Sequence, residues 1–126
     1  MALELEEVTG PLIGAAIEVH RRLGPGFIEA VYEEALAIEL RERAIAFERQ
    51  FPVSVSYRGQ VVGLHRLDIF VEGQIIVELK AVKQLTDTHF AVVRSYLRAV
   101  DRPHGLILNF AKTVLEVKRV RSRPDP

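Results

Sequence analysis

Three charged side chains stand inside apolar segments of the sequence, where core residues would be expected. Glu78 and Lys80 belong to the run Ile-Val-Glu-Leu-Lys, and Asp68 stands between two apolar residues. Side chains alternate along a strand, so Glu78 and Lys80 share one face. Two carboxylates at close range repel unless a cation joins them, and Mg²⁺ takes one or two carboxylates together with substrate phosphate. A neighbouring ammonium can orient an attacking water and offset charge in the transition state. The pattern indicates metal-assisted hydrolysis of a phosphate ester; the alternative is an ordinary ion-pair ladder.

The turn between the two strands decides whether Asp68 meets Glu78. A two-residue turn at Glu72-Gly73 would set the carboxylates on opposite faces, because a slip of one residue turns every side chain over. A three-residue loop over 71–73, with Gly73 in the left-handed conformation, restores a common face. We therefore predict a loop of odd length, or a bulge, in this hairpin.

The helix predicted over residues 27–43 offers a third carboxylate, Glu29. On a helical wheel Glu29 falls on the shoulder of the apolar arc, from which a carboxylate can reach over the sheet. The alternative is that Glu29, in the first turn, complements the helix dipole. The arc itself consists of Ile28, Val31, Tyr32, Ala35, Leu36 and Ile38.

The rest of the pattern supplies the elements that position these groups. Thr9 is expected to cap a helix over 11–23, which ends at Gly24, and another helix is expected over 86–100. Strands are predicted at 45–47, 51–57, 61–71, 74–82, 105–110 and 114–120. The order α-α-β-β-β-β-α-β-β indicates a mixed α/β (α+β) domain in which one crossover helix returns a strand to the sheet. We expect a single domain over residues 1–126.

Composition and charge exclude several classes of protein. The chain has 126 residues, a formal net charge of zero and no cysteine, which excludes disulfide scaffolds, thiolate nucleophiles and zinc fingers. No apolar run approaches the ~20 residues of a membrane span, so no membrane partner is expected. Residues 1–7 are acidic and lack the layout of a signal peptide, which predicts a cytoplasmic protein.

The end of the chain is locally basic despite the neutral total. Residues 112–123 hold five basic residues against one acidic residue, and among them Lys118 and Arg119 lie in the last predicted strand and Arg121 directly follows it. Such a strand can meet phosphate, which makes these three residues candidate substrate contacts. The alternative is a solvated edge strand protected from aggregation by its charges.

Several motifs occur together and in a fixed order over roughly residues 8–121. They are Gly26-Phe-Ile-Glu29-Ala-Val-Tyr32, Arg66-Leu-Asp68, Ile76-Val-Glu78-Leu-Lys80-Ala, His89-x-Ala91, Tyr96-Leu97 and Leu106-Ile-Leu-Asn109-Phe110. In this combination the chain resembles the GxxExxY proteins, a bacterial family within the PD-(D/E)xK nuclease superfamily.

The resemblance implies a restriction-endonuclease-like core, in which helices flank a central mixed sheet. It implies that Asp68 and Glu78 bind a divalent cation, Mg²⁺ or alternatively Mn²⁺, with help from the Leu79 carbonyl. It implies further that Lys80 orients the water and that Glu29 is an accessory acid near the metal.

One position departs from the family. The family commonly has Gln after His89-x-Ala91, whereas this chain has Val92, which removes a polar contact from the expected site and weakens the expectation of efficient catalysis. His89 either contacts phosphate or caps its helix. The Tyr32 hydroxyl either forms a hydrogen bond with a carboxylate of the site or reaches solvent while the ring belongs to the core.

Three functions follow from these observations. The first is a Mg²⁺-dependent nuclease that cleaves phosphodiester bonds of nucleic acid, with DNA favoured over RNA. The second is a nuclease-fold module without useful turnover that binds nucleic acid or a partner protein. The third is a small non-enzymatic domain with ion-paired carboxylates. A homodimer is a further partner to consider, because single-domain nucleases often cut two strands as dimers.

Overall fold

The computed structural model describes residues 5–123 and contains three helices and five strands in that range. In chain order they are α1 (Leu5–Leu23), α2 (Glu29–Glu42), β1 (Phe47–Tyr57), β2 (Gln60–Val71), β3 (Ile75–Lys80), α3 (Asp87–Val100), β4 (His104–Asn109) and β5 (Glu116–Arg121). The start of the acidic segment before Leu5 lies outside the described residues. Within them, no helix has the length and apolar content of a membrane span.

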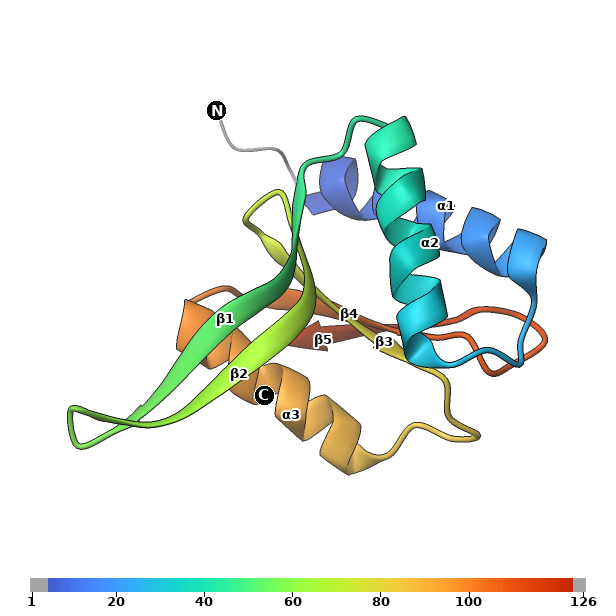
Figure 1. The fold of residues 1–126 in the computed structure, drawn as a ribbon. Helices are drawn as coiled ribbons and strands as arrows, with labels where there is room; N and C mark the ends of the chain where they lie inside the picture. The colour runs from blue at the N-terminus through green and yellow to red at the C-terminus, as the bar shows by residue number, and fades with distance from the viewer. Residues whose placement is uncertain (1–4, 124–126) are drawn as a thin grey trace.

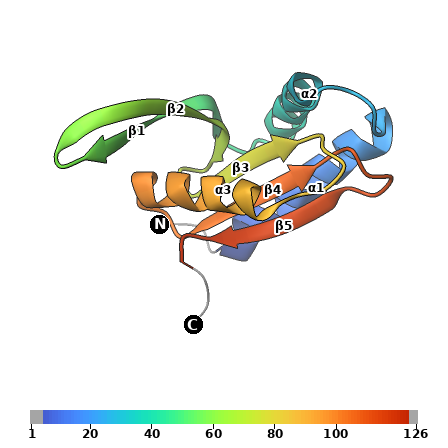
Figure 2. The ribbon, with the colours of Figure 1, turned by 90° about the horizontal axis from the view of Figure 1, so that it is seen from below.

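The strands form one mixed sheet in the order β1-β2-β3-β4-β5. β1, β2 and β3 make an antiparallel meander, and β5 pairs antiparallel with β4. β4 lies parallel to β3 because α3 carries the chain back across the sheet. α1 and α2 cover one face and α3 covers the other (Figures 1 and 2).

The core is divided between the two faces of the sheet. Ile69 and Val77 pack with α1 and α2, whereas Phe70 and Ile76 pack with Val93 and Leu97 of α3. Since side chains alternate along β3, Glu78 and Lys80 lie on the α3 face with Ile76. The face that carries the candidate chemistry is therefore the face that only one helix covers.

The predicted order with four strands before α3 is wrong: the order is α-α-β-β-β-α-β-β. Of the predicted strand at 45–47 only Phe47 is in a strand, and it belongs to the same strand as 51–57: β1 runs through residues 48–50 and stays paired with β2 at Arg49↔Ile69 and Phe51↔Leu67. Gln50, between them, has a positive φ of 50°, so the strand kinks there without losing its register.

The predicted cap of the first helix is also wrong. Thr9 lies inside α1, and its hydroxyl donates a hydrogen bond to the Leu5 carbonyl (3.0 Å) instead of capping a helix that begins at 11. The predicted start at Pro11 reflects the usual place of proline in a first turn. The other elements lie within two residues of their predicted bounds.

Candidate active site

The β2–β3 turn determines how the two carboxylates meet. Val71 pairs with Ile75, so the loop has three residues, Glu72, Gly73 and Gln74. Glu72 and Gly73 both take the left-handed conformation (φ 54° and 62°). The predicted odd loop length is confirmed, although the loop lies one residue later than 71–73. The register places Asp68 opposite Glu78.

The strands stop pairing regularly where the carboxylates begin. Ile69↔Val77 is the last pair of the ladder on this side. Beyond it, the Asp68 N–H donates to Glu78 Oε1 (3.3 Å), and the Leu79 N–H donates to Asp68 Oδ2 (2.9 Å). The two carboxylates thus take the place of backbone acceptors and are held between β2 and β3.

Burial dominates the electrostatics of this pair. Glu78 is only 6% exposed. Burial, followed by repulsion from Asp68, raises the pKa of Glu78 to about 8, against smaller opposing effects of the Asp68 N–H and Lys80. Burial also raises the pKa of Asp68, although the bond from the Leu79 N–H opposes the rise. Holding both groups ionised is therefore costly unless positive charge is added.

Lys80 supplies part of that positive charge without neutralising the pair. It is half-buried on the same face as Glu78, and its charge lowers the pKa of both carboxylates. Among the ion pairs within residues 5–123, none joins Lys80 to a carboxylate within 4.0 Å. The ion-pair ladder considered as an alternative is not formed, and the ammonium is left available to other groups.

The donor set suits a hard divalent cation completed by other oxygen ligands. In the described part of the chain, no three His, Cys, Asp or Glu side chains gather as a metal centre, so the two carboxylates are the acidic groups that could contribute ligands here. The Lys80 carbonyl accepts the Phe110 N–H from the β4 side (2.8 Å). Successive carbonyls alternate between neighbouring strands, so the Leu79 carbonyl lies on the β2 side, with Asp68. Two carboxylates and a carbonyl, with water and phosphate for the rest, fit Mg²⁺.

Glu29 lies at the rim of this pair and not within it. It is the first residue of α2 and is exposed. Its charge nevertheless raises the pKa of both Asp68 and Glu78, so the start of α2 lies near the pair. The structure thus brings Asp68, Glu78, Lys80 and the Leu79 backbone together, with Glu29 beside them.

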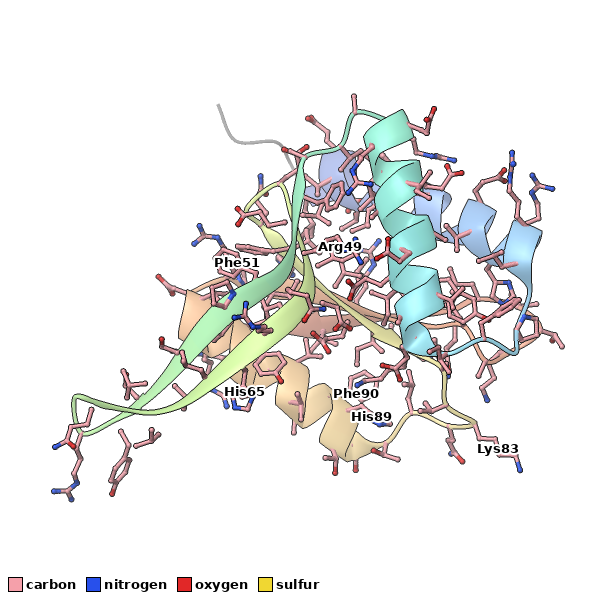
Figure 3. The ribbon with its side chains drawn as sticks, viewed as in Figure 1. Arg49, Phe51, His65, Lys83, His89 and Phe90 are labelled. Carbon is pink, nitrogen blue, oxygen red and sulfur yellow. The ribbon has the colours of Figure 1, made fainter. Side chains whose placement is uncertain are left out.

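Glu33 is a second acid of α2 beside the site, and it was not among the predicted site residues. The charge of Glu33 raises the pKa of Asp68, and its effect is larger than the effect of the charge of Glu29. Glu33 is buried and accepts hydrogen bonds from Arg49 (2.8 and 3.0 Å) and from Gln50 Nε2 (2.8 Å). Arg49 lies between β1 and α2 (Figure 3). The spacing in the sequence could have indicated this, because Glu33 follows Glu29 by one helical turn and so lies on the same face of the helix.

α3 supplies the opposite wall of the site. Burial raises the pKa of Tyr96, and the charges of Glu78 and Asp68 raise it further, which places the phenol near the pair. The His65 ring lies 5.6 Å from the Tyr96 ring, where β2 passes α3 (Figure 3). Val92 stands one turn before Tyr96 and is 37% exposed. No role was predicted for Tyr96, although it lies in one of the recognised motifs.

Two candidate residues are engaged elsewhere. The Tyr32 hydroxyl donates to the Gly24 carbonyl (2.6 Å) and accepts the Phe27 N–H (3.2 Å), and the ring stacks on Phe110. His89 Nδ1 accepts the Thr86 N–H (3.0 Å) in a capping box at the start of α3. Tyr32 therefore closes the turn before α2, and His89 caps its helix.

The three basic candidates of β5 divide between the two faces of the sheet. Lys118 pairs with Ile107, which pairs with Glu78, so Lys118 shares the face of the carboxylates two strands away. Arg119 and Arg121 lie on the other face, where they line a cavity of about 280 Å³ beneath α1. Only Lys118 of the three is placed to serve the same site.

Comparison with known proteins adds family and fold. The model of the PD-(D/E)XK nuclease superfamily matches residues 6–120. A solved structure, described as the crystal structure of SSO0001, matches with a TM-score of 0.60 and 14% sequence identity over 76% of this chain. The match covers 50% of that chain, so this chain spans about half its length, and at this identity it shows the fold alone. No curated protein matches the chain.

Proposed function

The chain belongs to the PD-(D/E)XK nuclease superfamily, and on that premise we propose that it is a metal-dependent nuclease that hydrolyses phosphodiester bonds of DNA. We infer from the resemblance of its motifs that, within the superfamily, it belongs with the GxxExxY proteins. The observation that carries the proposal is the buried Asp68–Glu78 pair, held between β2 and β3 with Lys80 on the same face.

Each residue of the site has a role that follows from its place. Asp68, Glu78 and the Leu79 carbonyl would hold Mg²⁺, or Mn²⁺ in its place. When bound, the cation supplies positive charge that polarises the phosphate and makes a water molecule easier to deprotonate. Lys80 would orient that water and offset charge that develops on the phosphate. Glu29 would act from the rim as an accessory acid, and Lys118 would contact a neighbouring phosphate along the same face.

The experiment compares wild type with Asp68→Asn and Lys80→Ala on plasmid, linear duplex, single-stranded DNA and RNA, with Mg²⁺ or Mn²⁺. We expect wild type to cleave DNA and each variant to lose about 10²-fold or more in rate. Glu42→Gln, an exposed carboxylate at the end of α2, is the matched control and should cleave normally. Thermal melts verify that each variant folds. Equal cleavage by wild type and both site variants would refute the mechanism.

Val92 supports a second candidate, a nuclease-fold module that binds a partner protein or nucleic acid without useful turnover. The family's polar residue is missing next to Tyr96, where α3 walls the site. This candidate expects no cleavage of any substrate by wild type and one stoichiometric partner in a pull-down. Cleavage that Asp68→Asn abolishes excludes it.

A further inference from the structure

The β1–β2 hairpin extends well beyond the rest of the sheet. β1 has eleven residues and β2 twelve, but β3 pairs with β2 only at Ile69, Phe70 and Val71. Residues 54–64, which we call the arm, therefore form a two-stranded ribbon that projects from the body (Figures 1 and 2). An isolated two-stranded hairpin is at best marginally stable in water. The arm is expected to gain stability from a partner.

The arm is apolar where it meets solvent. Tyr57, Val61, Val62 and Leu64 are between 63% and 72% exposed. Clustered exposed apolar side chains mark interaction surfaces in soluble proteins. The only full charge in the arm is Arg58, which lies over the Tyr57 ring (5.8 Å). Nucleic acid is a poor occupant for such a surface, because phosphate binding needs several cations.

A groove lies between the base of the arm and α3. It has a volume of about 580 Å³, and its lining combines small side chains, Ser54 and Ser56 from β1 and Ser95 and Ala99 from α3, with the larger Val55, His65 and Arg98. Small residues leave space that a bulky apolar side chain can fill. The same chain thus presents an exposed apolar ribbon and, beside it, an open groove that has room for a side chain.

Pro52 disfavours one way in which two hairpins could join, which is edge-to-edge pairing of their β1 strands. Proline has no N–H, and within a strand it is tolerated where that missing donor faces an open edge. Pro52 pairs with Arg66 on β2, so its deficient side is the free edge of β1. Extension of the sheet past Pro52 along this edge is therefore disfavoured, which favours docking through side chains.

We propose that the arm of one copy docks into the groove of a second copy, and that the exchange is reciprocal and forms a two-fold homodimer. A closed exchange covers both arms and both grooves at once, as two-fold symmetry requires. Arg58 is the one full charge of the arm, so the docked ribbon brings little charge into the interface. The inference does not depend on nuclease activity.

Disulfide trapping tests this directly, because the chain has no cysteine. Leu64→Cys and Ala99→Cys are made as separate variants, mixed and oxidised. Exchange predicts a disulfide between the two variants, in a species of twice 14.2 kDa. Val114→Cys, on the distant loop before β5 and 76% exposed, is the control and should not crosslink to Ala99→Cys. Equal crosslinking by Leu64→Cys and Val114→Cys would overturn the proposal.

Solution mass provides an independent measurement. Wild type should dimerise with increasing concentration, and Leu64→Glu should weaken the dimer about tenfold or more, while Val114→Glu should not. Thermal melts show that the variants fold. A wild type that stays monomeric up to about 1 mM, assemblies larger than a dimer, or a dimer that Leu64→Glu leaves intact would each contradict the arm exchange. If wild type is monomeric and binds DNA, and Leu64→Glu loses that binding, the arm would contact nucleic acid instead of a second copy.

Discussion

Replacement of Glu78 by Gln should stabilise the metal-free protein at neutral pH. Burial raises the pKa of Glu78 from 4.5 to about 8, so between these values the folded protein holds a proton that the unfolded chain releases. Stability then falls as pH rises, since the folded state binds more protons. Gln cannot ionise and escapes this cost, while its amide oxygen can still accept the Asp68 N–H.

The size of the effect follows from the two pKa values. Between the two pKa values, each rise of one pH unit lowers the free energy of unfolding by about 1.4 kcal/mol. At pH 7, which lies 2.5 above the ordinary pKa of 4.5, the carboxylate costs about 3 kcal/mol, and the cost levels off above pH 8. Glu78→Gln should therefore unfold about 10 °C higher than wild type at pH 7. Below pH 4 the two proteins should become nearly equal.

Urea unfolding of both proteins from pH 4 to pH 8, with EDTA present, measures this difference. Glu42→Gln, which removes an exposed carboxylate, should follow wild type throughout. The reasoning fails if the stabilities of wild type and Glu78→Gln run parallel across the range. A larger gap at pH 4 than at pH 8 would reverse the sign and refute the burial of a protonated Glu78.

Two further substitutions test the scaffold. Tyr32→Phe removes a hydroxyl bonded to two backbone groups and should cost about 1 kcal/mol of stability without changing DNA cleavage; strong loss of cleavage in a folded variant would show that the hydroxyl serves the site. Gly105→Ala adds a Cβ that would lie 3.1 Å from the Ile76 carbonyl and 3.2 Å from a Val93 methyl, under α3. It should destabilise by about 1–3 kcal/mol in urea, whereas Gly10→Ala, with nothing within 4 Å, should not.

The positions of Asp68, Glu78 and Lys80 could be predicted because they depend on local rules. Alternation fixes the face of each side chain in a strand, and a glycine suited to positive φ constrained the hairpin loop. With the loop length known, the register follows without any tertiary information. The error of one residue in the loop's position left the shared face unchanged, because both alternatives have an odd number of residues.

Glu33 could not be placed by the same rules. Its burial depends on hydrogen bonds from Arg49 and Gln50, which lie 16 and 17 residues away in sequence. The same contacts bear on the error in β1: the predicted strands leave out the polar residues 48–50, but Arg49 and Gln50 bond to Glu33 of α2 while the backbone stays paired on either side of Gln50. Where the hydrogen-bond partners of polar residues come from another element, the sequence alone predicts neither the strand that carries those residues nor their place in the site.

The strand β2 connects the arm to the carboxylate pair. Leu64 of the arm precedes Asp68 by four residues, or about 13 Å along an extended strand. A copy docked on the arm would therefore lie close to the carboxylate pair and could help to position it. Within residues 5–123 a single chain presents one such pair. Cleavage of both strands of a duplex needs either two successive encounters or two centres held together, and arm exchange supplies the second. A monomeric arm variant should then keep its chemistry but nick plasmid rather than linearise it, which separates the role of the arm from that of the site.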